Sequence, residues 1–144
     1  MGKTTALTPQ QKRGLELFLT KGNCVSCHHG PFLTSQDYMP TNLQGDEGRA
    51  KVTKNLSDKG LFRIPTLRNV GLTGPYFHNG AVTSLDEAVF LRANNMRLQE
   101  YKGKGTPDPS SLVLNETEVK DVAAFLKALN GKMPAIFEPK QFPQ

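Results

Sequence analysis

The stretch CVSCH, residues 24–28, decides how this chain must fold. The chain has two cysteines, Cys24 and Cys27, and His28 directly follows the second. With this spacing both thiols can bond the vinyl groups of one haem while the imidazole ligates the iron. Two cysteines alone are too few for a zinc site, and no βαβ pattern suits a thioredoxin-like pair. The motif therefore predicts one covalent haem c, with His28 as the proximal iron ligand.

Three segments carry start signals for helices, which we expect over residues 9–21, 85–96 and 116–129. Each follows a residue whose side chain can cap the free N–H groups of a first turn: Thr8, Ser84 and Asn115. In the second segment one helical face comprises Leu85, Ala88, Val89, Arg92 and Met96. In the third the apolar face comprises Val119, Val122, Ala123, Phe125, Leu126 and Leu129. We expect the first and last helices to pack together.

The length indicates one domain over residues 1–144. The expected helices make this an all-α domain. An apolar content of 37% is low for a large core, and a bound haem would supply part of the interior. The long loops, rich in Gly and Pro, also need a large rigid group to organise against. We expect residues 1–7 to be flexible and residues 134–144 to form an extended tail.

The charge balance is basic, with 18 Lys and Arg against 13 Asp and Glu. A net charge of +5 suits acidic redox protein partners, although solvated surface lysines would give the same count. We expect no nucleic-acid partner, a monomer, and no membrane span, because no apolar run approaches the required length. Haem is attached to such motifs outside the bacterial cytoplasmic membrane. We therefore expect a periplasmic chain whose export signal has been removed.

The sixth iron ligand decides between electron transfer and ligand activation at the iron. The candidate donors are Met39, Met96, Met133, His29, His78 and Tyr101. His29 adjoins the proximal ligand and cannot reach the opposite haem face. Met39 is only eleven residues past His28, so its loop would have to wrap the haem edge at once. Met133 follows the end of the last helix, where a Met most often fills a gap in apolar packing. Met96, at the end of the middle helix, is therefore the expected ligand.

Two further elements, PTLRN at residues 65–69 and PYFHNG at residues 75–80, extend the pattern beyond CVSCH. With them the sequence resembles the C-terminal haem domain of bacterial di-haem cytochrome c peroxidases and their MauG-type relatives. The resemblance runs over residues 8–131 and implies a class-I cytochrome c-like helical fold with long loops. It also implies a high-potential, electron-accepting haem. The second CxxCH motif of those enzymes is absent here.

The family's distal ligand is also missing. In the peroxidases a Met follows the His of PYFHDG by about fourteen residues, which here is Arg92. A guanidinium has no lone pair for iron, whereas Met96 lies one helical turn further along the same face. Arg92 would then bind a haem propionate or point to solvent. The same resemblance implies that Arg68 is a propionate partner and Arg63 a weaker one. It implies that His78 supports the haem site from behind the residues that touch the haem, or fixes a loop.

Pro65, the first residue of PTLRN, is also a cofactor-binding position by this resemblance. The leading interpretation is a periplasmic monohaem cytochrome that carries single electrons between redox partners. Two alternatives stay open. One is a haem peroxidase with an open iron site, and the other is a haem subunit or sensor within a larger redox complex.

Overall fold

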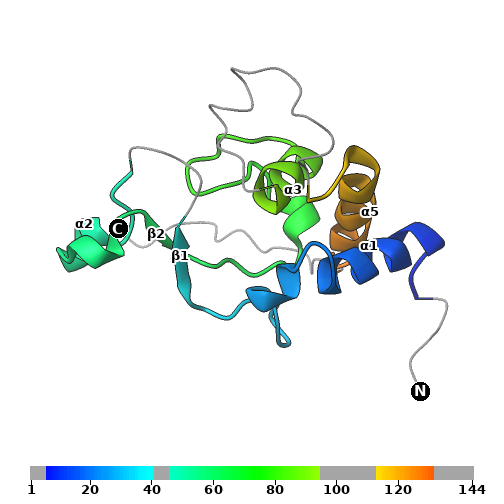
Figure 1. Cartoon of the computed structure of the whole chain (residues 1–144), viewed down its shortest axis with the longest axis horizontal. Coiled ribbons are helices and arrows are strands. Elements are labelled where there is room, and N and C mark those ends of the chain that lie inside the picture. The colour runs from blue at the N-terminus through cyan, green and yellow to red at the C-terminus, as the bar shows by residue number, and fades with distance from the viewer. Residues whose placement is uncertain (1–5, 41–45, 95–112, 132–144) are drawn as a thin grey trace, which may run out of the picture.

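The computed structural model describes residues 6–40, 46–94 and 113–131. The longer helices are α1 (Pro9–Leu19), α3 (Leu85–Ala93) and α5 (Glu116–Lys127). The smaller elements are α2 (Ala50–Thr53), the strands β1 (Tyr38–Pro40) and β2 (Leu61–Arg63), and 3-10 turns at Cys24–Ser26, Leu56–Asp58 and Val70–Leu72. Figure 1 shows α1, α3 and α5 together, while the two strands and α2 extend away from them. The described helices include none with the length and apolar character needed to cross a bilayer.

The predicted capping signals set the helix starts. At Thr8 and at Asn115 both halves of a capping box are formed, with Gln11 and Glu118 as the reciprocal partners. At Ser84 the side-chain oxygen accepts the N–H three residues on, at 3.5 Å. Each bond satisfies a backbone donor that has no partner inside its helix. These signals therefore fix where all three helices begin.

Helices α1 and α5 cross in close contact, as predicted. Gly14 lies against the backbone of Asp121, where a Cβ atom on Gly14 would stand 1.9 Å from the Asp121 oxygen. Next to this crossing the rings of Phe18 and Phe125 meet edge to face, with 5.3 Å between centroids. Arg13 donates to the Asp121 carboxylate at 2.8 Å. A glycine at this position thus allows the two helix backbones to touch.

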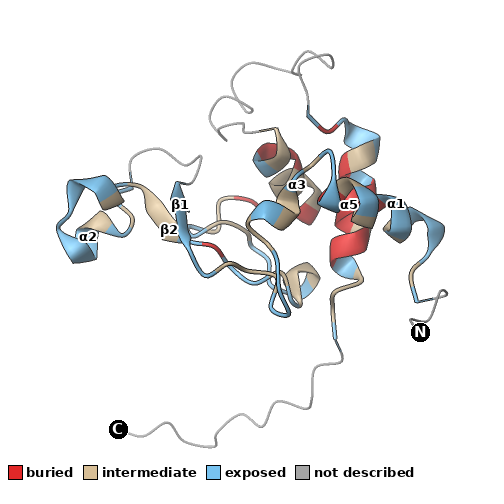
Figure 2. Ribbon diagram, turned by 60° about the horizontal axis from the view of Figure 1, so that its bottom comes forward, coloured by how far each residue is buried: buried red, intermediate tan, exposed pale blue. Residues whose placement is uncertain are grey.

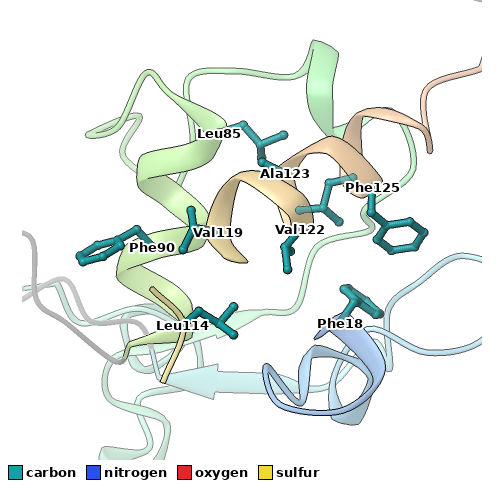
Figure 3. Close-up of a cluster of buried hydrophobic side chains, with 9 residues drawn as sticks. Phe18, Leu85, Phe90, Leu114, Val119, Val122, Ala123 and Phe125 are labelled. Carbon is teal, nitrogen blue, oxygen red and sulfur yellow. The ribbon is translucent and has the colours of Figure 1, made fainter. Parts of the chain in front are cut away.

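The core lies between α1, α3 and α5 (Figure 3). Its buried members are Phe18, Leu85, Phe90, Leu114, Val119, Val122, Ala123, Phe125 and Leu126. The core members on α5 match the predicted apolar face, whereas Leu129 lies past the end of this helix and is only partly buried. Each large side chain removed from water contributes roughly 1.5–3 kcal/mol. Figure 2 shows the buried residues gathered on this side of the molecule, whereas α2 and β1 are mainly exposed.

Helix α3 is shorter than its sequence signals indicate. It spans Leu85–Ala93, whereas the expected helix ran to Met96, which lies outside the described residues. The Asn94 side chain ends the helix by donating to the Leu114 carbonyl at 3.1 Å and accepting the Leu114 N–H at 2.9 Å. This reciprocal pair ties the end of α3 to the segment that leads into α5.

The helical face predicted on α3 is only partly covered by the core. Leu85, Phe90 and Leu91 are buried, whereas Ala88 and Val89 are half-buried and Arg92 is exposed. The reason is packing: Leu85 and Phe90 join the cluster built on α5 and Leu114, which turns the Arg92 face away from the core.

The fold class is mainly helical, as predicted, with a small antiparallel sheet that the sequence did not indicate. Strands β1 and β2 pair with Met39 opposite Phe62. The ladder continues where the Ile64 N–H donates to the Asp37 carbonyl at 2.8 Å. This sheet links the loop after the CVSCH motif to the loop before PTLRN.

We predict that Gly14→Ala lowers the free energy of unfolding by about 2–3 kcal/mol, because the new methyl group forces α1 away from α5. Urea denaturation followed by circular dichroism measures this change. Lys12→Ala, on the exposed side of α1, is the matched control and should have little effect. A stability for Gly14→Ala equal to that of Lys12→Ala would contradict the close crossing.

A second prediction concerns the Asp121 carboxylate at this crossing. The hydrogen bond from Arg13 holds the pKa of Asp121 below its ordinary value. The carboxylate therefore stabilises the fold above about pH 4, and this contribution is lost as the pH falls through the lowered value. Asp121→Asn should flatten the acid limb of stability against pH, measured by urea denaturation at several pH values. Glu16→Gln, which removes an exposed carboxylate from α1, should leave that limb as in the parent chain.

Candidate functional site

The CVSCH motif forms a single tight turn directly after α1. Residues Cys24–Ser26 are a 3-10 turn, and the N–H groups of Cys27 and His28 both donate to the Cys24 carbonyl, at 3.2 and 2.9 Å. Residues three and four apart in such a turn lie on the same side. The two thiols and the imidazole therefore belong to one local unit. Both cysteines are free thiols and half-buried.

His28 is held in the form that a metal ligand requires. Its Nδ1 lies 3.0 Å from the carbonyl oxygen of Leu33, so Nδ1 carries the proton and Nε2 keeps a free lone pair. Burial lowers the pKa of His28, and the nearby charge of Arg92 lowers it further, whereas the carbonyls of Leu33 and Pro65 act in the opposite direction. A neutral imidazole fixed through one nitrogen fits a haem iron at the other. The sequence had not indicated the Leu33 carbonyl, because any residue type can supply one.

The loop of residues 29–36, which carries Leu33, is bound to the segment of residues 63–68. Thr34 donates its hydroxyl to the Ile64 carbonyl at 2.7 Å, and Thr66 donates its hydroxyl to the Phe32 carbonyl. These bonds from side-chain hydroxyls to backbone carbonyls hold the two segments together without a regular β-ladder. PTLRN thus supports the loop that orients His28.

Three of the predicted cofactor-binding residues border one hollow of about 560 Å³ beside this contact. They are Arg63, Pro65 and Arg68, and apolar Phe32 and Ile64 line the same hollow. The Arg68 guanidinium donates through Nε and Nη2 to the Pro31 carbonyl, at 2.9 and 2.7 Å. Arg63 donates to the side-chain oxygen of Gln36 at 3.3 Å. The propionate roles expected for both arginines stay predictions.

Arg92 extends from α3 toward the CVSCH turn. Its Nη1 donates to the Pro40 carbonyl at 3.4 Å, which bridges α3 and β1. The pKa of Cys24 is raised, mainly by burial, while the positive charge of Arg92 acts to lower it. The same charge acts on His28. Arg92 therefore lies within electrostatic reach of two predicted haem-binding positions, on the helix where the family resemblance places the distal ligand.

His78 links two loops. Its Nε2 lies 3.0 Å from the Asp46 carboxylate, and its ring stacks on Phe62 with 3.8 Å between centroids. The pKa of Asp46 is lowered, mainly by the hydrogen bond from the Gly48 N–H and to a smaller extent by His78. Sequence reasoning missed Asp46, although Asp followed two residues later by Gly is a recognisable turn signal.

The candidate distal ligands are only partly placed. Met39 lies in β1 with 40% of its surface exposed, and His29 is exposed beside the proximal ligand. Met96, Tyr101 and Met133 lie outside the described residues. The choice of Met96 as sixth ligand therefore stays a prediction.

Comparison with known proteins gives matches along most of the chain. The cytochrome c family model matches residues 11–130. Cytochrome c551 peroxidase of Pseudomonas aeruginosa is 38% identical over 148 aligned positions, covering 96% of this chain and 39% of that protein. Methylamine utilization protein MauG of Methylorubrum extorquens is 31% identical, covering 97% of this chain and 40% of that protein.

A solved structure supports the same architecture. A MauG-like protein associated with microbial copper homeostasis has a TM-score of 0.72 and 26% identity, over 88% of this chain and 48% of that chain. The chain thus spans about two-fifths of the length of the curated relatives named above. It resembles one haem domain of the di-haem peroxidases and MauG-type proteins, as the sequence predicted.

Proposed function

The chain belongs to the cytochrome c family, and we propose that it is a monohaem cytochrome that carries single electrons between redox proteins. The observation that carries this proposal is the fixed CVSCH turn, with the Nδ1 of His28 bonded to the Leu33 carbonyl at 3.0 Å. Domains of this family bind haem c covalently. One CxxCH motif in this sequence supports one haem.

Each residue of the turn has a definite role in this proposal. Cys24 and Cys27 would tether the haem through thioethers, and Nε2 of His28 would bind its iron. When bound, the haem supplies a reversible one-electron iron couple. The protein's part is to keep His28 neutral and oriented: burial lowers the pKa of the ring, and the Leu33 carbonyl fixes its orientation. Arg63, Pro65, Arg68, His78 and Arg92 are the proposed further haem-binding positions.

We place the carrier in the periplasm because haem is attached to CxxCH motifs outside the bacterial cytoplasmic membrane. The proposed partners are redox proteins with acidic surfaces, since the chain has a net charge of +5. A single domain acting as a monomer is the simplest arrangement for such a carrier.

A haem peroxidase is the second candidate function. Arg92 stands where the resemblance places a ligating Met, and a guanidinium cannot occupy that coordination position. The names of the relatives, cytochrome c551 peroxidase among them, favour the same reading. This candidate requires an open sixth position, whereas Met96 closes it in the carrier.

The haem attachment gives the first test of the proposal. The denatured, reduced chain should retain one haem per polypeptide, because two thioethers hold it. Haem staining after denaturing electrophoresis, with a pyridine haemochrome assay for stoichiometry, measures this. Replacing Cys24 and Cys27 together by Ala should remove the stain. Haem that acidic solvent extracts freely from the parent chain would contradict the assignment.

The sixth ligand gives the second test. Met96→Ala should convert ferric iron from low to high spin and lower the reduction potential, because a thioether favours ferrous iron. Absorption spectroscopy and redox titration follow both changes. Met39→Ala and Met133→Ala are matched controls and should leave the spectrum as in the parent chain. A high-spin parent chain with sustained peroxide turnover would instead favour the peroxidase.

A further inference from the structure

We infer that Arg68 is a positioning residue for the proximal histidine, acting through the loop that holds its ring. The inference rests on the proposed function, in which Nε2 of His28 binds haem iron. It assigns to Arg68 a contact with the protein backbone where the family resemblance implies a haem propionate.

The geometry around Pro31 carries the first step. Both Nε and Nη2 of Arg68 point at one acceptor, the Pro31 carbonyl oxygen, at 2.9 and 2.7 Å. Such a pair of bonds from a cation is stronger and more directional than a single neutral bond. One edge of the guanidinium therefore binds the backbone of the loop at Pro31, 37 positions earlier in the chain.

The backbone of this loop is strained at Leu33, the residue whose carbonyl accepts from His28, so the loop requires contacts that hold it in place. Leu33 has a φ of 52°, in the left-handed region that residues with a Cβ atom rarely adopt. The carbonyls of Pro31 and Phe32, directly before it, are held by Arg68 and Thr66. These two anchors hold Leu33 in the conformation that turns its carbonyl toward His28.

The consequence for the iron follows from that carbonyl. A strong hydrogen bond from Nδ1 makes the imidazole a more basic ligand, which favours the ferric state. Loosening the Pro31 anchor lets the Leu33 carbonyl withdraw from Nδ1. The histidine then becomes a weaker donor, and the reduction potential rises.

The direction of the change in reduction potential distinguishes a positioning role of Arg68 from a purely electrostatic one. A cation near the haem destabilises ferric iron more than ferrous iron. Removing such a cation, or one paired with a propionate, therefore lowers the reduction potential. Loss of positioning raises the potential instead. Arg63 provides the matched control, because it borders the same hollow but bonds the Gln36 side chain and no carbonyl of the loop.

The experiment compares Arg68→Gln, Arg68→Lys and Arg63→Gln in the haem-loaded chain. Redox titration gives the potential, and proton NMR of the reduced protein gives the exchange rate of the His28 Nδ1 proton. We expect Arg68→Gln to have a higher potential than Arg63→Gln, which loses the same charge, and to speed this exchange about tenfold, as loss of a charge-assisted bond implies. Arg63→Gln should lower the potential through the lost charge, with exchange as in the parent chain.

Arg68→Lys keeps the charge but provides one donor group in place of two. Its exchange rate should lie between those of the parent chain and Arg68→Gln, and its potential should rise above the parent's because no charge is lost. If Arg68→Gln does not fold, this variant decides alone, and a potential and exchange rate equal to the parent's overturn the inference. A fall in potential for Arg68→Gln that matches Arg63→Gln overturns it as well. Failure of the parent chain to hold covalent haem would instead overturn the proposed function.

Discussion

The direct backbone contact between α1 and α5 at Gly14 is the constraint on which the rest of the structure depends. No side chain separates Gly14 from Asp121, so the direction of α1 is fixed by α5. The CVSCH turn begins only a few residues after α1 ends, which leaves little freedom between the crossing and the predicted haem-binding residues. Core packing thereby determines where Cys24 and His28 lie, although neither residue belongs to the buried cluster.

The same core also supports the far side of the site, through PTLRN. The side-chain oxygen of Asn69 accepts the Gly131 N–H at 2.7 Å, and that of Asn130 accepts the Gly71 N–H at 3.1 Å. These reciprocal bonds attach PTLRN to the residues just past α5. Since Arg68 precedes Asn69, the residue that anchors the His28 loop is itself held in place by the end of α5. Contacts with α5 therefore position both the CVSCH turn and PTLRN.

Local signals explain which parts were predictable. Capping at Thr8 and Asn115 acts within four residues, so the starts of α1 and α5 could be read from the sequence. The end of α3 could not, because Asn94 ends it by bonding Leu114, twenty positions away. The short strands lack a clear alternating pattern. The contact between Arg68 and the Pro31 carbonyl could not be predicted from the sequence, because its acceptor is a backbone group that every residue has.

In the proposed carrier, two features of the protein act on the iron's reduction potential in opposite directions. The Leu33 carbonyl strengthens His28 as a donor and so favours ferric iron. The charge of Arg92, within reach of Cys24 and His28, opposes further positive charge and so favours ferrous iron. Leu33 is held by its anchored loop, and Arg92 by a helix packed into the core. Because both positions are set by packing, the fold determines the balance between these opposing effects.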